Sequence, residues 1–133
     1  MIFVDTGAFL AWYIAGDQHH RRAVRAWKQL ERSGSPLFTS NFVVDETLTL
    51  LARRTTYAFA AERAEVLYSS RLLTILRPDA ADEIAAVDLF RKFADQGVSF
   101  TDCVSFALMT RHRLKQVFTF DRHFRHAGFD VRA

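Results

Sequence analysis

Short runs of β-branched and aromatic residues alternate with longer segments of helical periodicity along the 133 residues of this chain. This alternation is the feature that most limits the fold, because parallel neighbours in a sheet need crossover connections, which are usually helical. It predicts an α/β fold, with a parallel sheet of about four to five strands and helices on both faces. Strands are expected at residues 2–4, 37–39, 72–76 and 117–120, and helices at residues 7–14, 19–33, 41–54, 58–69, 79–94 and 101–113.

The length of the chain is that of one domain, for which roughly 100 to 150 residues is usual. Residues 33–36 read Ser-Gly-Ser-Pro, which ends a helix and turns the chain, but no stretch has the composition of a linker and no segment repeats. Half of the residues are hydrophobic and 25% are charged, as in an ordinary globular protein. We therefore expect residues 1–133 to form a single domain.

Cysteine content and hydropathy indicate a cytoplasmic protein. Cys103 is the only cysteine, so no internal disulfide is possible, and no Cys/His pair has the short spacing of a zinc site. Residues 1–5 contain no basic leader, and no apolar run approaches the roughly 18 residues of a membrane span. We expect Cys103 to fill space in the core, and Trp12 and Trp27 to pack there or at an interface.

Positive charge is concentrated in the C-terminal residues 111–133 of a chain with net charge +3. A basic surface attracts phosphate backbones whatever their base sequence, so this segment favours a nucleic-acid partner, although a solvated basic face fits the charge equally well. A second basic segment begins at His19 and His20, and for it a solvated face is the simpler interpretation. The C-terminal cations are Arg111, Arg113, Lys115, Arg122, Arg125 and Arg132, against Asp121 and Asp130; the earlier ones are Arg21, Arg22, Arg25 and Lys28.

Three aspartates lie where an α/β sheet places its ligands, beyond the carboxyl ends of the strands. Asp5 and Asp121 directly follow expected strands, and Asp102 opens a helix after residues 98–100. Each also has a purely structural interpretation. Asp5 and Asp121 are suited to capping the next helix or turn, and Asp102 stands three residues after Ser99, as in a capping box.

Glu46 is the most informative acid, because it lies within a helix on the same face as Phe42, Val43 and Leu50. A carboxylate on an apolar face is costly unless it is paired or binds a metal. Its neighbour Asp45 should point toward other residues. The structural alternative for Glu46 is a salt bridge with Arg53 or Arg54.

A cluster of Asp5, Glu46, Asp102 and Asp121 would need a cation, since four carboxylates repel one another in a water-poor site. Hard oxygen ligands suit Mg²⁺ or Mn²⁺. Such an ion activates a bound water and neutralises charge on a phosphodiester, so the cluster predicts metal-dependent hydrolysis.

The chain resembles a PIN domain of the VapC toxin group. The matching segments are Phe3-Val4-Asp5-Thr6, the run Thr39 to Glu46, Ser99-Phe100-Thr101-Asp102 with Phe106-Ala107, and Val117-Phe118-Thr119-Phe120-Asp121-Arg122-His123-Phe124. In order and spacing they span nearly the whole chain, residues 1–133.

The resemblance implies that Asp5, Glu46, Asp102 and Asp121 bind metal, with Asp121 acting directly or through water, and that Thr6 and Thr119 are hydroxyl neighbours. It also implies a ribonuclease that uses Mg²⁺ or Mn²⁺, often a homodimer, acting as the toxin of a type II toxin–antitoxin pair with a small antitoxin protein. The alternatives are a PIN-like module that binds RNA or protein without cleavage, and a PIN nuclease that is not a toxin.

Overall fold

The structure is a computed structural model that describes residues 1–133, and at its centre is a five-stranded sheet in the order β3-β2-β1-β4-β5. Every neighbouring pair of strands is parallel. The expected α/β fold with a parallel sheet is therefore confirmed. The strands are β1 (Ile2–Val4), β2 (Leu37–Ser40), β3 (Leu73–Leu76), β4 (Gln116–Phe118) and β5 (Asp130–Val131).

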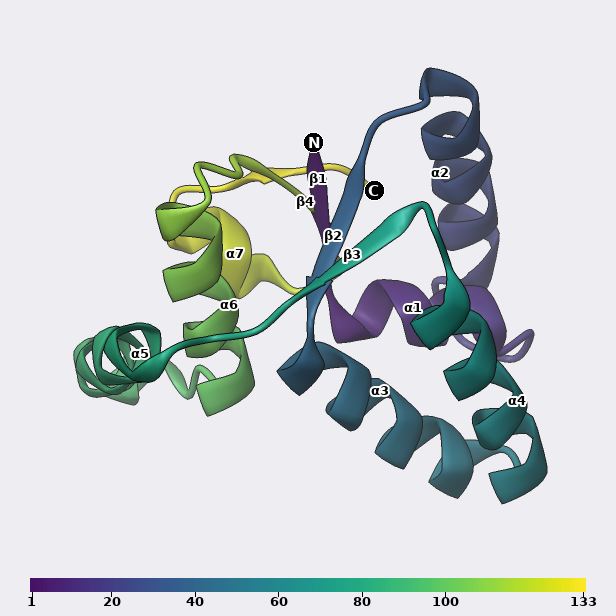
Figure 1. Cartoon of the computed structure of the whole chain (residues 1–133), viewed down its shortest axis with the longest axis horizontal. Coiled ribbons are helices and arrows are strands. Elements are labelled where there is room, and N and C mark those ends of the chain that lie inside the picture. The colour runs from purple at the N-terminus through teal and green to yellow at the C-terminus, as the bar shows by residue number, and fades with distance from the viewer.

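Helices cover both sides of this sheet (Figure 1), with α5, α6 and α7 on one side and α1, α2 and α4 on the other. No helix has the length and apolar character that crossing a membrane requires. The helices are α1 (Thr6–Tyr13), α2 (His20–Ser33), α3 (Asn41–Arg54), α4 (Tyr57–Ser69), α5 (Ala80–Lys92), α6 (Phe100–Arg111) and α7 (Arg122–His126), with a short 3-10 turn at Ala94–Gln96.

The strand order reverses between β1 and β4. The chain runs outward from β1 to β2 and β3, and then returns to place β4 and β5 on the other side of β1. In an open parallel sheet, the helices that follow the strands diverge at such a point and leave a crevice beyond the carboxyl ends. Asp5 follows β1 and Asp121 lies beyond the end of β4, so the topology brings both acids to this crevice.

The core is built mainly from aromatic and branched side chains of the sheet and the helices around it. Phe3, Phe9, Phe118 and Phe124 are all fully buried. Trp27 is also buried, and its ring stacks on that of Trp12 with centroids 4.2 Å apart. Trp12 is partly buried and packs against the core, so both tryptophans take part in packing, one of the two roles expected for them, and Cys103 is buried as expected.

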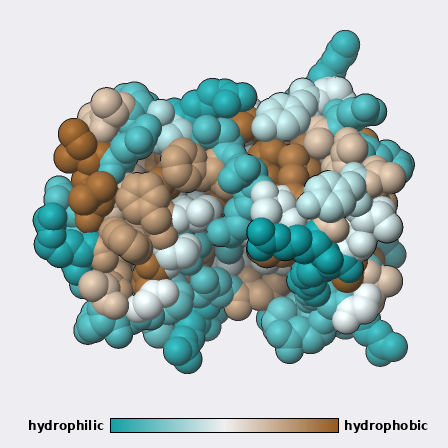
Figure 2. Space-filling model, turned by 90° about the horizontal axis from the view of Figure 1, so that it is seen from below, coloured by the Kyte–Doolittle hydropathy of each residue, from teal (hydrophilic) through white to brown (hydrophobic).

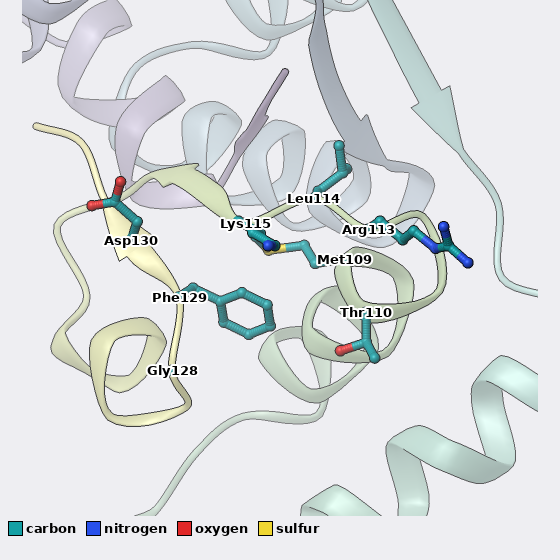
Figure 3. Close-up of a pocket in the computed structure, with 8 residues that line it drawn as sticks. All are labelled: Met109, Thr110, Arg113, Leu114, Lys115, Gly128, Phe129 and Asp130. Carbon is teal, nitrogen blue, oxygen red and sulfur yellow. The ribbon is translucent and has the colours of Figure 1, made fainter.

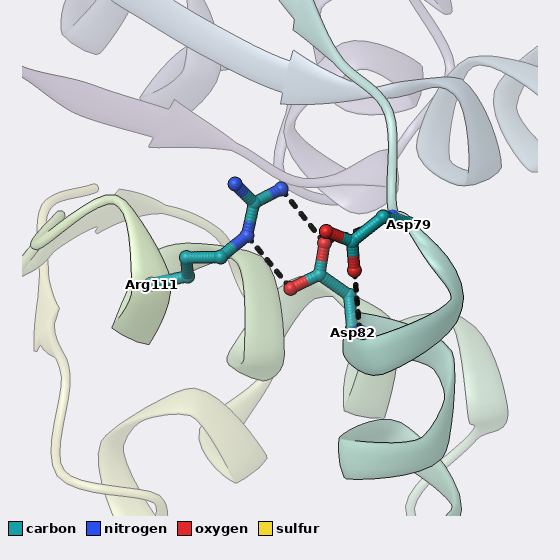
Figure 4. Close-up of polar contacts among 3 residues, drawn as sticks. All are labelled: Asp79, Asp82 and Arg111. Atoms are coloured by element: carbon teal, nitrogen blue, oxygen red, sulfur yellow. Dashed lines mark hydrogen bonds and ion pairs between the residues drawn. The ribbon is translucent and has the colours of Figure 1, made fainter.

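An ion pair joins α5 to α6 away from the sheet (Figure 4). The guanidinium of Arg111 donates two hydrogen bonds of 2.7 Å to the carboxylate of Asp82. Asp82 also accepts a hydrogen bond from the backbone N–H of Asp79, which completes a capping box at the start of α5. The contact with Arg111 lowers the pKa of Asp82, so this buried carboxylate stays ionised.

Two elements were not predicted from the sequence, namely α7 and β5. The strand expected at residues 117–120 ends at Phe118, because the hydroxyl of Thr119 accepts a hydrogen bond from the backbone N–H of Asp121 and the chain turns there. The helix expected to reach residue 113 ends at Arg111, and Arg113 has a left-handed backbone with φ of 56°. Contacts of this kind, between residues close in sequence, produce no hydrophobic periodicity from which the ends of these elements could be predicted.

Candidate active site

A cavity of about 470 Å³ opens at the carboxyl edge of the sheet and contains all four acids singled out in the sequence. Asp5 and Asp121 come from the segments after β1 and β4, Glu46 comes from α3, and Asp102 comes from α6. Thr6, Ser99, Phe120 and His123 also line the cavity. The fold thus brings together side chains that are spread over most of the chain.

Asp5 is almost fully buried, with 4% of its surface exposed. It occupies the N-cap position of α1, but its side chain makes no capping hydrogen bond, so the structural interpretation fails here. Instead its Oδ2 accepts a hydrogen bond of 2.8 Å from the hydroxyl of Thr119. Its Oδ1 has no hydrogen-bond partner although it is buried.

Asp121 fits both the structural interpretation, as a helix cap, and the functional one, as an acid of the site. Its Oδ1 accepts a hydrogen bond of 2.8 Å from the backbone N–H of His123 and so caps α7. The Nδ1 atom of the His123 ring lies 2.9 Å from the same oxygen. The carboxylate of Asp121 also lies close enough to that of Asp102 for the two groups to interact.

Asp102 lies in the first turn of α6, where Ser99 is the N-cap and accepts a hydrogen bond of 3.1 Å from the backbone N–H of Asp102. The reciprocal bond from the Asp102 carboxylate to Ser99, which a capping box requires, is not formed. Asp102 is buried, with 7% of its surface exposed, yet it lines the cavity with the other acids. Helix capping therefore does not explain this aspartate.

Glu46 and Asp45 differ as the helical geometry predicted. Glu46 is half-buried and lines the cavity with Leu50 on the next turn of α3, whereas Asp45 is exposed. Glu46 forms no ion pair. Arg54, one of the partners considered for it, instead contacts Asp17 at 3.1 Å.

Burial and crowding raise the pKa of two of the acids. Removal from water raises the pKa of Asp5 to about 7 despite the hydrogen bond from Thr119, and the charges of Asp121 and Glu46 add to this effect. Removal from water also raises the pKa of Asp102 to about 9, with further contributions from the charges of Asp5 and Asp121. Without a cation, the site therefore retains protons near neutral pH.

The donors of the cavity fit a hard divalent cation. Asp5 Oδ1 and Thr6 Oγ1 are buried oxygens without a partner, and a buried polar atom of this kind is costly unless a ligand or water completes it. One ligand atom each from Asp102, Asp121 and His123 lies within 4.8 Å of the others. Carboxylate oxygens are the ligands that Mg²⁺ and Mn²⁺ prefer.

His123 was not assigned a role from the sequence, although it belongs to the quoted segment Val117 to Phe124. A histidine two residues after an acid gives no helical or strand signal, and only the turn at α7 brings its ring to Asp121. The structure also adds Phe120 and Ser99 to the cavity wall.

A second cavity, of about 500 Å³, lies at the opposite edge of the sheet, beside the residues that lead into β4 and β5 (Figure 3). Its lining is Met109, Thr110, Arg113, Leu114, Lys115, Gly128, Phe129 and Asp130. It contains a single acid, Asp130, beside two cations, and so lacks a set of hard metal ligands. The acid cluster is confined to the carboxyl edge.

Known proteins resemble this chain over nearly its full length. The model of the PIN domain family matches residues 2–130. The 23S rRNA-specific endonuclease VapC20 of Mycobacterium tuberculosis is 38% identical, with 97% of this chain and 95% of that protein covered. A VapC ribonuclease of Archaeoglobus fulgidus is 31% identical, with 91% of this chain and 77% of that protein covered.

Solved structures show the same fold. The crystal structure of the Mycobacterium tuberculosis VapC20, described as a Sarcin-Ricin loop cleaving toxin, superposes with a TM-score of 0.86 at 34% identity, covering 97% of this chain and 96% of that one. FitAcB from Neisseria gonorrhoeae gives a TM-score of 0.72 at 21% identity, which supports the fold alone, covering 100% of this chain and 97% of that one. The resemblance inferred from sequence motifs is confirmed: the chain belongs to the PIN domain family and, within it, to the VapC group.

Proposed function

We propose that this protein is a divalent-metal-dependent ribonuclease that hydrolyses RNA phosphodiester bonds, and that it is the toxin of a type II toxin–antitoxin pair. The observation that carries the proposal is the convergence of Asp5, Glu46, Asp102 and Asp121 in one cavity. The activities named for the VapC relatives support the choice of RNA as substrate.

The four acids would bind Mg²⁺ or Mn²⁺, an ion that supplies an activated water and neutralises charge on the phosphate. Asp5 is the central ligand in this proposal, because its Oδ1 is buried without a partner while Thr119 orients its other oxygen. Glu46 and Asp102 approach from two different helices, and Asp121 completes the set directly or through water. No serine or cysteine nucleophile with a positioned base competes with this arrangement: the pKa of Cys103 is raised to about 11 by burial, so its thiol stays protonated.

Cleavage of purified ribosomal RNA, assayed with Mn²⁺, with Mg²⁺ and with excess EDTA, tests the proposal. We expect discrete fragments with either ion and none with EDTA. Cleavage that persists in EDTA would contradict the role of a metal. Metal-independent RNA binding without any fragments would favour the alternative, a PIN-like module that does not cut.

A second copy of the chain is the proposed partner of the outer face of α5. Ile84, Val87 and Phe90 are 65%, 44% and 47% exposed on this helix. Hydrophobic side chains gather on the side of the molecule where α5 lies (Figure 2). Light scattering should give the mass of a dimer, and Val87→Glu should give that of a monomer.

A small antitoxin protein is the proposed inhibitor. The VapC20 relative is named as a toxin, and in a toxin–antitoxin pair the antitoxin would block the RNA site. A small open reading frame immediately upstream of the gene would be the first candidate. Its product, expressed together with this chain, should co-purify with it and abolish cleavage; independent purification of the two would contradict the pairing.

A further inference from the structure

The acid cavity has an electrostatic difficulty as an RNA site, because its ionised carboxylates repel a polyanion until a metal is bound. Cations close to the cavity would offset this repulsion. The basic segment His19 to Lys28, interpreted from the sequence as a solvated face, contains such cations. Its helix α2 begins at the carboxyl edge of the sheet and runs toward the opposite edge (Figure 1).

Phe120 connects the acid cavity to α2. Its ring lines the cavity directly before Asp121. On it stacks the ring of His19, with centroids 4.5 Å apart and planes inclined by only 7°. The guanidinium of Arg22 lies 5.2 Å from the centre of the same ring. The first turn of α2 therefore packs against Phe120 next to the cavity, although neither His19 nor Arg22 lines it.

The start of α2 is held in place by further hydrogen bonds. The backbone N–H of His19 donates a hydrogen bond of 2.9 Å to Asp17 Oδ1, and Arg54 holds the other oxygen of Asp17 at 3.1 Å. His20 contacts the carbonyl of Ala11 through its Nδ1 at 2.7 Å. The start of α2 is thus tied to α1 and α3, the helices that border the cavity.

Arg22 also borders a small hollow of about 130 Å³ on its other side, which it shares with Arg25, Gln29 and Ala133. Neither arginine is neutralised, since no cation of α2 takes part in an ion pair. The only acid on the helix is Glu31, near its far end. Two exposed, unpaired guanidinium groups therefore continue outward from the acid cavity.

We propose that Phe120, Arg22 and Arg25 form a track for the RNA backbone, in which Arg22 binds the phosphate beside the scissile one and Arg25 binds the next. The proposal rests on the function proposed above, because it assumes that the acids cut RNA. A guanidinium donates paired N–H groups that match phosphate oxygens, and stacking on Phe120 restricts Arg22 before RNA arrives. The contact is to the backbone, so it is independent of base sequence.

Binding of a fluorescein-labelled 12-nucleotide oligouridine, measured by polarisation in EDTA over a range of KCl concentrations, tests the track without any need for cleavage. We expect Arg22→Ala to weaken binding about 5- to 10-fold at low salt and to reduce the salt slope by about 0.7. Arg25→Ala should change both quantities in the same direction.

Arg32→Ala is the matched control. It removes the same charge from the same helix, about 15 Å further from the carboxyl edge at 1.5 Å per residue. We expect its affinity and salt slope to stay within twofold of the parent. Equal losses in Arg22→Ala and Arg32→Ala would overturn the track and leave only a diffuse effect of charge.

Failure of the proposed RNA track can be distinguished from failure of the proposed nuclease function. Mn²⁺ should raise the melting temperature of Arg22→Ala as much as that of the parent, because Arg22 does not line the acid cavity. If the parent fails to cleave RNA with Mn²⁺, the nuclease proposal fails while the binding comparison still stands. If the parent cleaves and Arg22→Ala binds like the parent, only the track is wrong.

Discussion

The hydroxyl of Thr119 donates a hydrogen bond of 2.8 Å to Asp5 Oδ2, a contact that joins the segments following the neighbouring strands β4 and β1 at their carboxyl ends. The same hydroxyl oxygen accepts a hydrogen bond of 3.0 Å from the backbone N–H of Asp121. Because the acceptor side of the hydroxyl is used by Asp121, its proton is directed toward Asp5. One buried threonine thus orients the carboxylate of Asp5 and holds the backbone of Asp121.

Thr119→Val should remove both hydrogen bonds while keeping the volume of the side chain. We expect a loss of about 1–3 kcal/mol of unfolding free energy, because a buried N–H and a buried carboxylate oxygen lose their partners. The pKa of Asp5 should rise further, so Mn²⁺ should bind more weakly at pH 7. Urea denaturation and Mn²⁺ titration measure both effects, and Thr119→Ser should restore most of each.

Glu46→Gln should abolish RNA cleavage, whereas Asp45→Asn should leave most of it. Glu46 lines the acid cavity and Asp45 is exposed on α3, although the two are adjacent in sequence. Both substitutions remove one negative charge and change little in size, so they form a matched pair. Loss of activity in Asp45→Asn alone would show that the wrong acid has been chosen.

Asp102→Asn should abolish cleavage without destabilising the metal-free protein. Because the pKa of Asp102 is raised to about 9, this acid is already protonated in the metal-free protein at pH 7, so the melting temperature in EDTA should stay about the same. Mn²⁺ should then stabilise the variant less than the parent, because a ligand is lost. A variant that melts lower yet still cleaves RNA would assign Asp102 to helix capping.

The metal-free protein should become less stable as the pH rises. The pKa values of Asp5 and Asp102 are raised from 3.8 to about 7 and about 9 in the folded chain. Between pH 4 and 9 the folded state therefore binds more protons than the unfolded state, and the unfolding free energy falls with increasing pH. Melting curves recorded in EDTA from pH 5 to pH 8 measure this loss of stability.

Excess Mn²⁺ should reverse that trend, because a metal binds the ionised carboxylates and competes with protons. The stabilisation by Mn²⁺ should be larger at pH 8 than at pH 6. A melting temperature in EDTA that rises over this range would mean that the acids are not crowded as the structure shows.

Arg111→Gln should lower the melting temperature, since it leaves the buried Asp82 without its two hydrogen bonds from the guanidinium. Arg91→Gln is the control, because Arg91 contacts Asp88 in an exposed pair on the same α5 helix. The control should melt like the parent. Equal melting of the two variants would show that the pair between α5 and α6 contributes nothing.

The sequence alone determined the layered α/β fold and the positions of the acids along it. Strands such as residues 2–4 and helices such as residues 41–54 have strong hydrophobic patterns, and burial on one face produces those patterns directly. The placement of Asp5 after a strand and of Glu46 on an apolar helix face followed from the same local geometry. These features depend on residues that are close in sequence.

Only the tertiary structure decided the strand order and the partners that converge on the acids. β5 has just two paired residues, Asp130 and Val131, and neither is fully buried, so no periodic pattern marks it. The stacking of His19 on Phe120 and the bond from Thr119 to Asp5 join segments that are far apart in the chain. Hydrophobic periodicity records which face of a segment is buried, but not which distant segment covers it.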